Sequence, residues 1–195
     1  HSSPIYEKPI VLKKSTVVTA FAEKSGVIAS PVSHAEFIRT NKFNSLDLKS
    51  EISPNYPALG KLSLSDNVRA STDFHDGNWL GFEGNDFEVV IDLGKKETIK
   101  KIRTGFLQNI GSWIFYPQKL EYLLSDDGEN YTSVYLYEDT TVESDKDGIN
   151  DFRFRVQNTK ARYLKIKAKS MGTCPEWHGG TGGKAWLFVD EIMVE

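Results

Sequence analysis

The sequence has few of the residues that cross-link a chain or hold a transition metal. Cys174 is the single cysteine among 195 residues, so no internal disulfide can form. His178 follows it closely, but no second cysteine or nearby histidine could complete the three or four ligands that zinc requires. Disulfide scaffolds and cysteine-based zinc modules are therefore excluded.

Long apolar runs and an excess of positive charge are also missing. No apolar stretch approaches the roughly 20 residues that a membrane-spanning helix needs. The formal net charge is −3 and the sequence pI is about 5.9, so no basic surface for nucleic acid or anionic lipid is indicated. Residues 1–4 lack signal-peptide character, and the abrupt start suggests a segment of a longer protein. We expect no nucleic-acid partner and no membrane span.

Catalytic signatures are absent as well. No G-x-S-x-G nucleophile elbow occurs in the sequence. Asp126 and Asp127 precede Gly128 in a pattern typical of a hairpin turn. Asp190 and Glu191 are adjacent, so in a regular strand their side chains point to opposite faces and cannot act on one substrate. The sequence therefore predicts that this chain is not an enzyme.

What the sequence does contain is β-strand patterning, and no segment shows a convincing helical period of 3.6 residues. Residues 87–94 (FEVVIDLG) form a dense β-branched and apolar run that ends at Gly94 and a charged turn, which is typical of a buried sandwich strand. Further strands are expected at residues 45–49, 98–107, 131–137, 152–156, 163–168 and 185–195. The pattern predicts an all-β sandwich or jelly roll.

Residues 1–40 are expected to form a separate, smaller domain in front of residues 41–195. No Gly/Ser linker follows the boundary, so the two domains are expected to adjoin. The small domain holds three short strand candidates, at residues 9–12, 16–22 and 33–38. Three such strands bury little apolar area, so this piece needs support from a neighbour or from additional strands.

Four motifs recur at strand spacing in the larger domain. They are Asp92-Leu93-Gly94, Ser125-Asp126-Asp127-Gly128, Ala161-Arg162-Tyr163 with Ile166, and Glu191-Ile192-Met193-Val194. In this order they resemble the motifs of a discoidin domain, also called the coagulation factor V/VIII type C domain, over residues 42–195. The resemblance implies a discoidin-like β-sandwich.

The smaller domain carries a second, shorter resemblance. Its sequence SSPIYEKPIVLKKSTVVTAFAEKSGVIASPVSHAEF is similar to the second half of the Ig-like module that follows the catalytic barrel in chitobiase-type β-N-acetylhexosaminidases. This implies a partial Ig-like β-module at residues 1–40. Together the two resemblances imply the C-terminal accessory region of such a glycoside hydrolase, in the periplasm, at the cell surface or secreted.

The resemblance also implies a structural calcium site. Asp66 and Asn67 stand where related modules carry Asp-Gly at the start of a calcium loop, Ser71 stands where they carry threonine, and Glu191 matches their C-terminal glutamate. Calcium takes six to eight oxygen ligands, many of them main-chain carbonyls, and oxygens near Arg69 would contribute. The substitutions at Asn67 and Ser71 leave open an alternative, an empty loop closed by hydrogen bonds.

Three loops carry a mixture of aromatic and polar residues that suits a sugar, because pockets combine apolar walls with a few convergent polar groups. The candidate ligand contacts are His75, Trp79, Gln108, Trp113, Trp177, His178 and Lys184. Trp79 and Trp186 have apolar neighbours, which favours a place in the core. Trp113 and Trp177 lie beside loop glycines, and the sequence leaves both roles open.

The implied function is a non-catalytic carbohydrate-binding accessory module of a secreted glycoside hydrolase. Its expected partners are a glycan, containing galactose or an N-acetylhexosamine, and the catalytic domain of the same chain, with the module itself monomeric. The alternative is a purely structural buttress that supports the enzyme and binds no ligand of its own.

Overall fold

The computed structural model describes residues 3–139 and 147–195. It divides into two compact units, one formed by residues up to Thr40 together with Glu195, the other by Asn41–Val194. The first unit contains one antiparallel hairpin, β1 (Thr16–Ala20) paired with β2 (Ser33–Phe37). No residue from 3 to 40 is buried.

The strand expected at residues 9–12 is not formed, and this prediction is wrong. Pro9 has no N–H to donate, and the described part of the chain supplies no third strand beside the hairpin for this segment to pair with. A β-branched, apolar segment without a pairing partner stays irregular, because strand propensity depends largely on packing against neighbours.

The second unit is a β-sandwich built from seven strands, which confirms the predicted all-β fold class. The strands are β3 (Ser45–Leu48), β4 (Leu80–Glu83), β5 (Phe87–Gln108), β6 (Lys119–Ser125), β7 (Thr132–Glu138), β8 (Gly148–Lys169) and β9 (Trp186–Val194). Two short 3-10 helices, η1 (Gly60–Leu64) and η2 (Ile110–Ser112), interrupt the loops. The strand order is β4-β9-β5-β8-β6-β7, and β3 pairs with β5.

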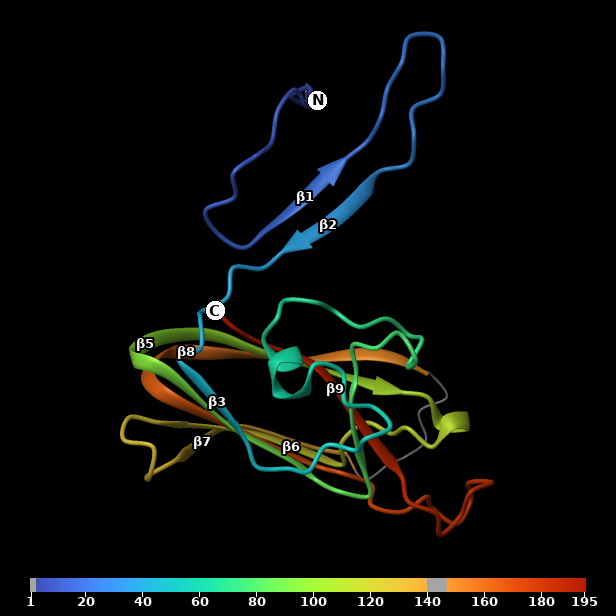
Figure 1. Cartoon of the computed structure of the whole chain (residues 1–195). Coiled ribbons are helices and arrows are strands. Elements are labelled where there is room, and N and C mark those ends of the chain that lie inside the picture. The colour runs from blue at the N-terminus through green and yellow to red at the C-terminus, as the bar shows by residue number, and fades with distance from the viewer. Residues whose placement is uncertain (1–2, 140–146) are drawn as a thin grey trace. The chain divides into compact units, whose positions relative to one another are not determined.

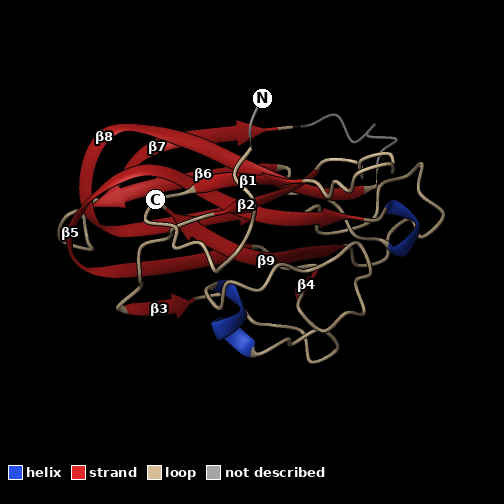
Figure 2. Cartoon of the chain, turned by 90° about the horizontal axis from the view of Figure 1, so that it is seen from above, coloured by secondary structure: helices blue, strands red, loops and turns tan. Residues whose placement is uncertain are grey.

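Two bent strands, β5 and β8, run through both layers of the sandwich (Figures 1 and 2). Each is 22 residues long, and each joins two segments that the sequence suggested as separate strands. Irregularities in their pairing fall between Asp92 and Glu97, where Gly94 adopts a φ of +80°. The charged stretch expected to end the strand therefore bends it instead, as bulges and glycines commonly do.

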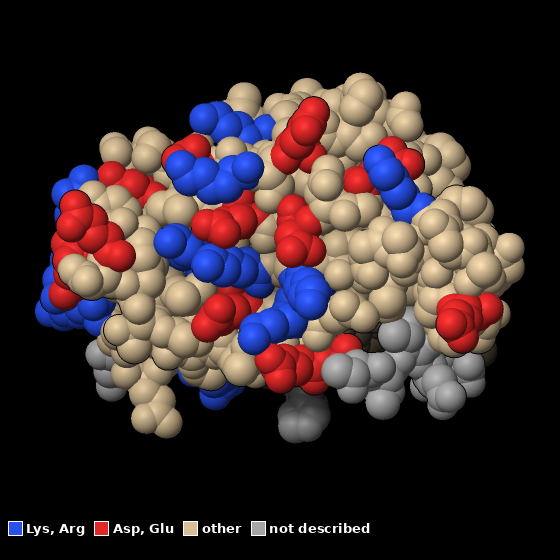
Figure 3. All heavy atoms as spheres, turned by 90° about the horizontal axis from the view of Figure 1, so that it is seen from below, with Lys and Arg blue, Asp and Glu red and all other residues tan. Residues whose placement is uncertain are grey.

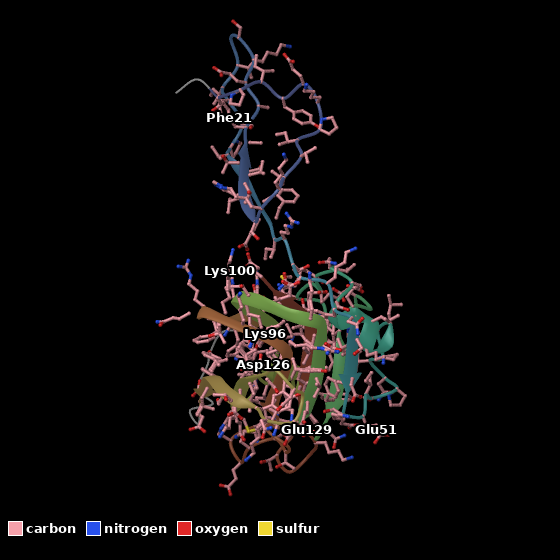
Figure 4. All side chains as sticks on the ribbon, turned by 90° about the vertical axis from the view of Figure 1, so that its left-hand side faces the viewer. Phe21, Glu51, Lys96, Lys100, Asp126 and Glu129 are labelled. Carbon is pink, nitrogen blue, oxygen red and sulfur yellow. The ribbon has the colours of Figure 1, made fainter. Side chains whose placement is uncertain are left out.

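The bend is held by the motifs that carry the family resemblance. Arg162 donates from Nε and Nη2 to the two carboxylate oxygens of Asp92, at 2.8 and 2.9 Å. These bonds hold the pKa of Asp92 at about 2. At the same end, Lys96 approaches Asp126 in the β6–β7 turn, with Nζ 2.5 Å from Oδ2 (Figure 4). Asp92, Arg162 and Asp126 of the motifs therefore hold the bend of the sandwich, and they do not serve as ligand contacts.

The core lies between the layers and is dense in aromatic and branched side chains. Phe82, Phe87, Phe106, Leu164 and Ile166 are all essentially inaccessible. Burying each such side chain contributes roughly 1.5–3 kcal/mol. On the face seen from below, Lys and Arg side chains alternate with Asp and Glu rather than forming a patch of one sign (Figure 3).

The bend places the loops of interest at one end of the sandwich. β5 starts opposite Ala168 and ends opposite Gly148, so both of its ends point away from the bend. The start of β9 lies beside the end of β5, since Leu107 pairs with Phe188. Residues 49–56, 84–86, 109–118 and 170–185 therefore gather at the end opposite the bend (Figure 1).

Candidate functional site

The loop after β5 is fixed to the start of β9 by main-chain hydrogen bonds. The N–H of Trp186 donates to the carbonyl of Trp113 at 2.8 Å, and the N–H of Phe115 donates to the carbonyl of Trp186 at 3.0 Å. Trp113 itself has a φ of +67°, a left-handed conformation that is uncommon for a large side chain. This local strain turns the indole toward the glycine-rich loop 170–185.

The glycine-rich loop packs directly on that indole. A Cβ atom at Gly180 would lie 2.4 Å from Cε2 of Trp113, and one at Gly183 would lie 2.7 Å from Cζ3. Both distances are too short for any side chain, so these glycines allow the backbone to approach the ring. Their role is close packing, which periodicity in the sequence could not reveal.

His178 joins the two loops and is not free for a ligand. Its Nε2 lies 2.8 Å from the carbonyl of Ile110, and its Nδ1 accepts from the N–H of Gly180 at 2.9 Å. A carbonyl can only accept, so Nε2 carries the proton and the ring is the neutral tautomer. The ring is buried, and the expected ligand role of His178 gives way to a structural one.

Two indoles beside His178 remain accessible. Trp177 is 56% exposed and Trp113 is 39% exposed. The centroid of the His178 ring lies 5.8 Å from that of Trp177 and 6.3 Å from that of Trp113, both edge-on. An accessible aromatic surface at the loop end is the chemical feature that a sugar ring would stack on.

Two of the predicted contacts lie in the core instead. Trp79 is 1% exposed, packs near Phe188, and donates from Nε1 to the carbonyl of Ser71 at 2.9 Å. Gln108 is the last residue of β5 and is also buried. The ligand role of both residues is corrected. Residues 71–79 cover the sheet, so the ring of Trp79 fills the space beneath them.

His75 is exposed, on the loop that precedes β4. Its ring stacks on Phe74, with centroids 4.0 Å apart, and its Nδ1 is 3.3 Å from Oδ1 of Asp73. Tyr56 lies between this loop and the start of β9, because its ring centroid is 6.3 Å from that of His75 and 5.2 Å from that of Trp186. His75 is thus linked to the start of β9 through the ring of Tyr56.

Lys184 borders a polar hollow of about 190 Å³ at the loop end. Besides Lys184, the hollow is lined by Glu51, Ile52, Ser53, Pro54, Glu83 and Asn85. The hollow has room for several water molecules or for part of one sugar residue. Sequence reasoning missed the two glutamates and Asn85, because only strand pairing brings residues 51–54, 83–85 and 184 together.

The predicted cation residues Asp66 and Glu191 are brought together by a β-bulge. Thr104 pairs with Ile192 and Phe106 with Val189, so Asp190 and Glu191 share the single position opposite Gly105. The carboxylates of Asp190 and Glu191 both accept hydrogen bonds from residues 67–70, whereas a regular strand would have placed them on opposite faces. The expectation that they point to opposite faces is therefore wrong.

The pair of carboxylates fits a cation. Oε2 of Glu191 accepts from the N–H of Asn67 at 3.1 Å. Burial, together with the neighbouring charge of Asp66, raises the pKa of Glu191 to about 8. The described residues hold no group of three or more His, Cys, Asp or Glu side chains suited to a metal, so main-chain oxygens would supply the remaining ligands.

Arg69 and Ser71 take other roles than side-chain ligands. The guanidinium of Arg69 donates to Asp190 and Asp151. The hydroxyl of Ser71 accepts from the N–H of Asp73 at 3.2 Å. The main-chain carbonyl of Ser71 accepts from Nε1 of Trp79. The main-chain oxygen of Arg69 stays a candidate cation ligand, and Ser71 helps to close the loop 71–79.

Comparisons with known proteins agree with this fold. Residues 49–190 match the model of the F5/8 type C domain. No curated protein matches the sequence, and no helix in the described residues is long and apolar enough to cross a membrane.

Several solved structures are similar. One is a CBM32 of AlyQ in complex with 4,5-unsaturated mannuronic acid (13% identity, TM-score 0.49, 80% of this chain and 98% of that one). Another is a pectin-binding carbohydrate-binding module (14% identity, TM-score 0.49, 80% of this chain and 92% of that one). A third is chitosan-binding module 1 of a chitosanase/glucanase from Paenibacillus sp. IK-5 (16% identity, TM-score 0.49, 80% of this chain and 98% of that one).

The family model spans most of the chain, from the loop after β3 to the bulge in β9. The DLG motif at Asp92 and the ARY motif at Arg162 form the ion pair at the bend of this sandwich. The chain belongs to the F5/8 type C domain family.

Proposed function

We propose that this chain is a non-catalytic carbohydrate-binding module whose sugar-binding surface is formed by Trp113 and Trp177. The observation that carries this proposal is the exposure of both indoles at the loop end, where a protein without a ligand has little reason to keep large aromatic rings. The hollow beside Lys184 offers carboxylate, amide and ammonium groups at the same end. A galactose- or N-acetylhexosamine-containing glycan suits this combination.

A glycan array on Trp177→Ala and Trp113→Ala variants tests the proposal. Trp177→Ala should abolish binding while lowering the melting midpoint little, because most of its ring is exposed. Trp113→Ala should also abolish binding but cost stability, since Gly180 and Gly183 pack on its ring. Leu136→Ala is the matched control, because Leu136 is 52% exposed on β7, outside these loops. Full binding by both tryptophan variants would refute the proposed surface.

The alternative is the structural buttress, and the hairpin unit is the observation that favours it. Every residue from 3 to 40 is exposed or half-exposed, so this unit is suited to packing on further protein. We infer that the unit is part of an Ig-like module of a chitobiase-type hydrolase acting outside the cytoplasm. A wild-type protein that binds no glycan, but stabilises a β-N-acetylhexosaminidase domain supplied in the same polypeptide, would support the buttress.

Calcium is the proposed ligand of Asp66 and Glu191. Bound cation would neutralise two adjacent carboxylates and stabilise the folded state by mass action. A melting curve in calcium should therefore have a higher midpoint than one in chelator, and Asp66→Asn should remove the difference. Identical midpoints for the wild-type protein would rule the cation site out.

The proposed module has no hydrolytic activity of its own. Asp190 is fully buried and paired with Arg69, so its carboxyl group cannot exchange a proton with a bound sugar. The purified chain should leave aryl N-acetylglucosaminides intact. Turnover that is lost on mutation of a carboxylate in this chain would overturn that expectation.

A further inference from the structure

We propose that Arg69 and Asp190 are the positioning residues of the cation site, holding Asp66 beside Glu191 before any cation arrives. This inference rests on the proposed cation site. It concerns two residues that would not touch the ion through their side chains. Their effect would be to fix the loop that carries one ligand against the strand that carries the other.

The contacts of Arg69 fasten its loop to two strands. Its Nε donates to Oδ2 of Asp190 on β9 at 2.6 Å, and its Nη2 donates to Oδ1 of Asp151 on β8 at 2.7 Å. The N–H of Ala70 donates to the same Oδ2 of Asp190 at 3.2 Å. Residues 69 and 70 are thus held by three hydrogen bonds to carboxylate oxygens, and such charge-assisted bonds are the stronger kind.

Asp190 is anchored in turn. Its side chain is fully buried, and its Oδ1 accepts from the N–H of Glu191 at 2.6 Å. The bulge presents Asp190 and Glu191 to the same loop, residues 66–70. The bond between Arg69 and Asp190 therefore also brings this loop onto Glu191. The result is the bond from the N–H of Asn67 to Glu191.

Gly105 shows that the strand is adapted to this ion pair. A Cβ atom at position 105 would lie 2.1 Å from Oδ1 of Asp190 and 2.7 Å from Nη2 of Arg69. Glycine within a strand is unfavourable for backbone entropy and leaves nothing to pack, and often marks a bulge or a close approach. Its presence near the end of β5 opens the space that the two charged groups occupy.

A second carboxylate completes the anchor on the far side. Asp151 accepts from Arg103, from Arg153 at 3.1 Å, and from Arg69. Although burial would raise its pKa, the hydrogen bonds from Arg103 and Arg69 hold the pKa of Asp151 at about 2. Arg69 therefore lies between Asp190 and Asp151, and its loop is fixed from both directions.

The consequence for the cation site follows from electrostatics. The carboxylates of Asp66 and Glu191 must both be charged to bind a cation, and their mutual repulsion would then push the loop away from β9. The clamp formed by Arg69 and Asp190 opposes this movement. A site that is already assembled binds its ion more tightly, and removal of such outer-shell partners typically lowers metal affinity 10–100-fold.

The test is calcium binding by titration calorimetry at pH 7 for the whole chain. Arg69→Gln should raise the calcium Kd about 10–100-fold. Arg69→Lys, which keeps the charge but loses the two-pronged geometry, should give a smaller rise. Arg153→Gln is the matched control, because Arg153 also donates to Asp151 but from a side chain that is nearly half exposed. Its calcium Kd should be unchanged.

Amide exchange in chelator gives a readout that needs no cation. The N–H of Asn67 should be protected in wild type and in Arg153→Gln, and should exchange faster in Arg69→Lys, which serves if the glutamine variant does not fold. Equal calcium affinity and equal Asn67 protection in wild type and Arg69 variants would overturn the positioning role alone. A wild-type chain that binds no calcium would overturn the cation site and this inference together.

Discussion

Residues 3–40 and residues 41–194 are both built from β-strands of similar composition, yet only the second unit buries side chains. Val17 and Phe37 in the hairpin are 59% and 50% exposed, whereas Val89 and Phe106 in the sandwich are fully buried. The residue types are the same, so composition does not make the difference. The number of paired strands does, because an isolated two-stranded hairpin offers no second layer to cover either face.

The comparison teaches which part of the chain carries its own stability. The sandwich has two layers closed by β5 and β8, and its core is continuous. The hairpin leaves large apolar groups such as Ile28, Val11 and Tyr6 more than two-thirds exposed. The largest differences in behaviour should therefore appear when the two units are separated.

Separation of the units is expected to have the largest effect. A peptide of residues 1–40 should show no β-sheet signal by circular dichroism, because it buries too little surface to offset backbone entropy. Residues 41–195 should unfold cooperatively at nearly the midpoint of the whole chain. A folded 1–40 peptide, or an unfolded 41–195 fragment, would break the comparison.

A matched pair of phenylalanine substitutions, one in each unit, compares their cores and is expected to have an effect of intermediate size. Phe106→Ala should destabilise the protein by roughly 3–5 kcal/mol, the usual cost of removing a buried aromatic ring. Phe37→Ala should change the free energy of unfolding by no more than about 0.5 kcal/mol. Chemical denaturation of the whole chain measures both, and a similar cost at the two positions would show that the hairpin has a core.

The smallest effect is expected at the ion pair of the bend. The pKa of Asp92 lies near 2 in the folded state, below its usual value of about 3.9. A lowered folded pKa contributes stability above the unfolded value and loses it as the pH falls through about 2. Asp92→Asn should therefore lower the melting midpoint by about 2–4 °C at pH 7 and by almost nothing at pH 2.

Asp47→Asn is the control for the bend, because Asp47 pairs with Lys49 and both side chains are more than half exposed. Its midpoint should match that of wild type at every pH. A deficit in Asp92→Asn that stays constant from pH 7 to pH 2 would contradict an origin in the charge of Asp92.

Much of the sandwich was readable from sequence because its strands alternate and its turns are marked. β7 begins one residue after its predicted start, and β9 forms within the predicted segment 185–195, although it pairs with β4 and β5 inside the sheet rather than closing it. β4 was missed, because four residues containing Gly81 show no usable alternation. The joining of 87–94 and 98–107 into one strand was also missed, since a bulge and a turn have similar local sequences.

The candidate site was less predictable, because it depends on contacts between distant segments. The exposure of Trp113 and the burial of Trp79 follow from which loop covers which ring, and the sequence leaves the role of Trp113 open. The paired orientation of Asp190 and Glu191 depends on a bulge that a regular strand period cannot show. Glu83 and Lys184 meet only through the pairing of β4 with β9.

The passage of β5 and β8 through both layers also constrains how the domain folds. Phe87 pairs with Ala168, so the central ladder joins segments that are far apart in the chain and must close a long loop before it stabilises anything. Such pairings fold slowly. They also leave neither layer able to open alone, because each contains half of the same two strands. Hydrogen exchange in the core should therefore proceed through a single global opening, with the amides of β5 and β8 sharing one free energy.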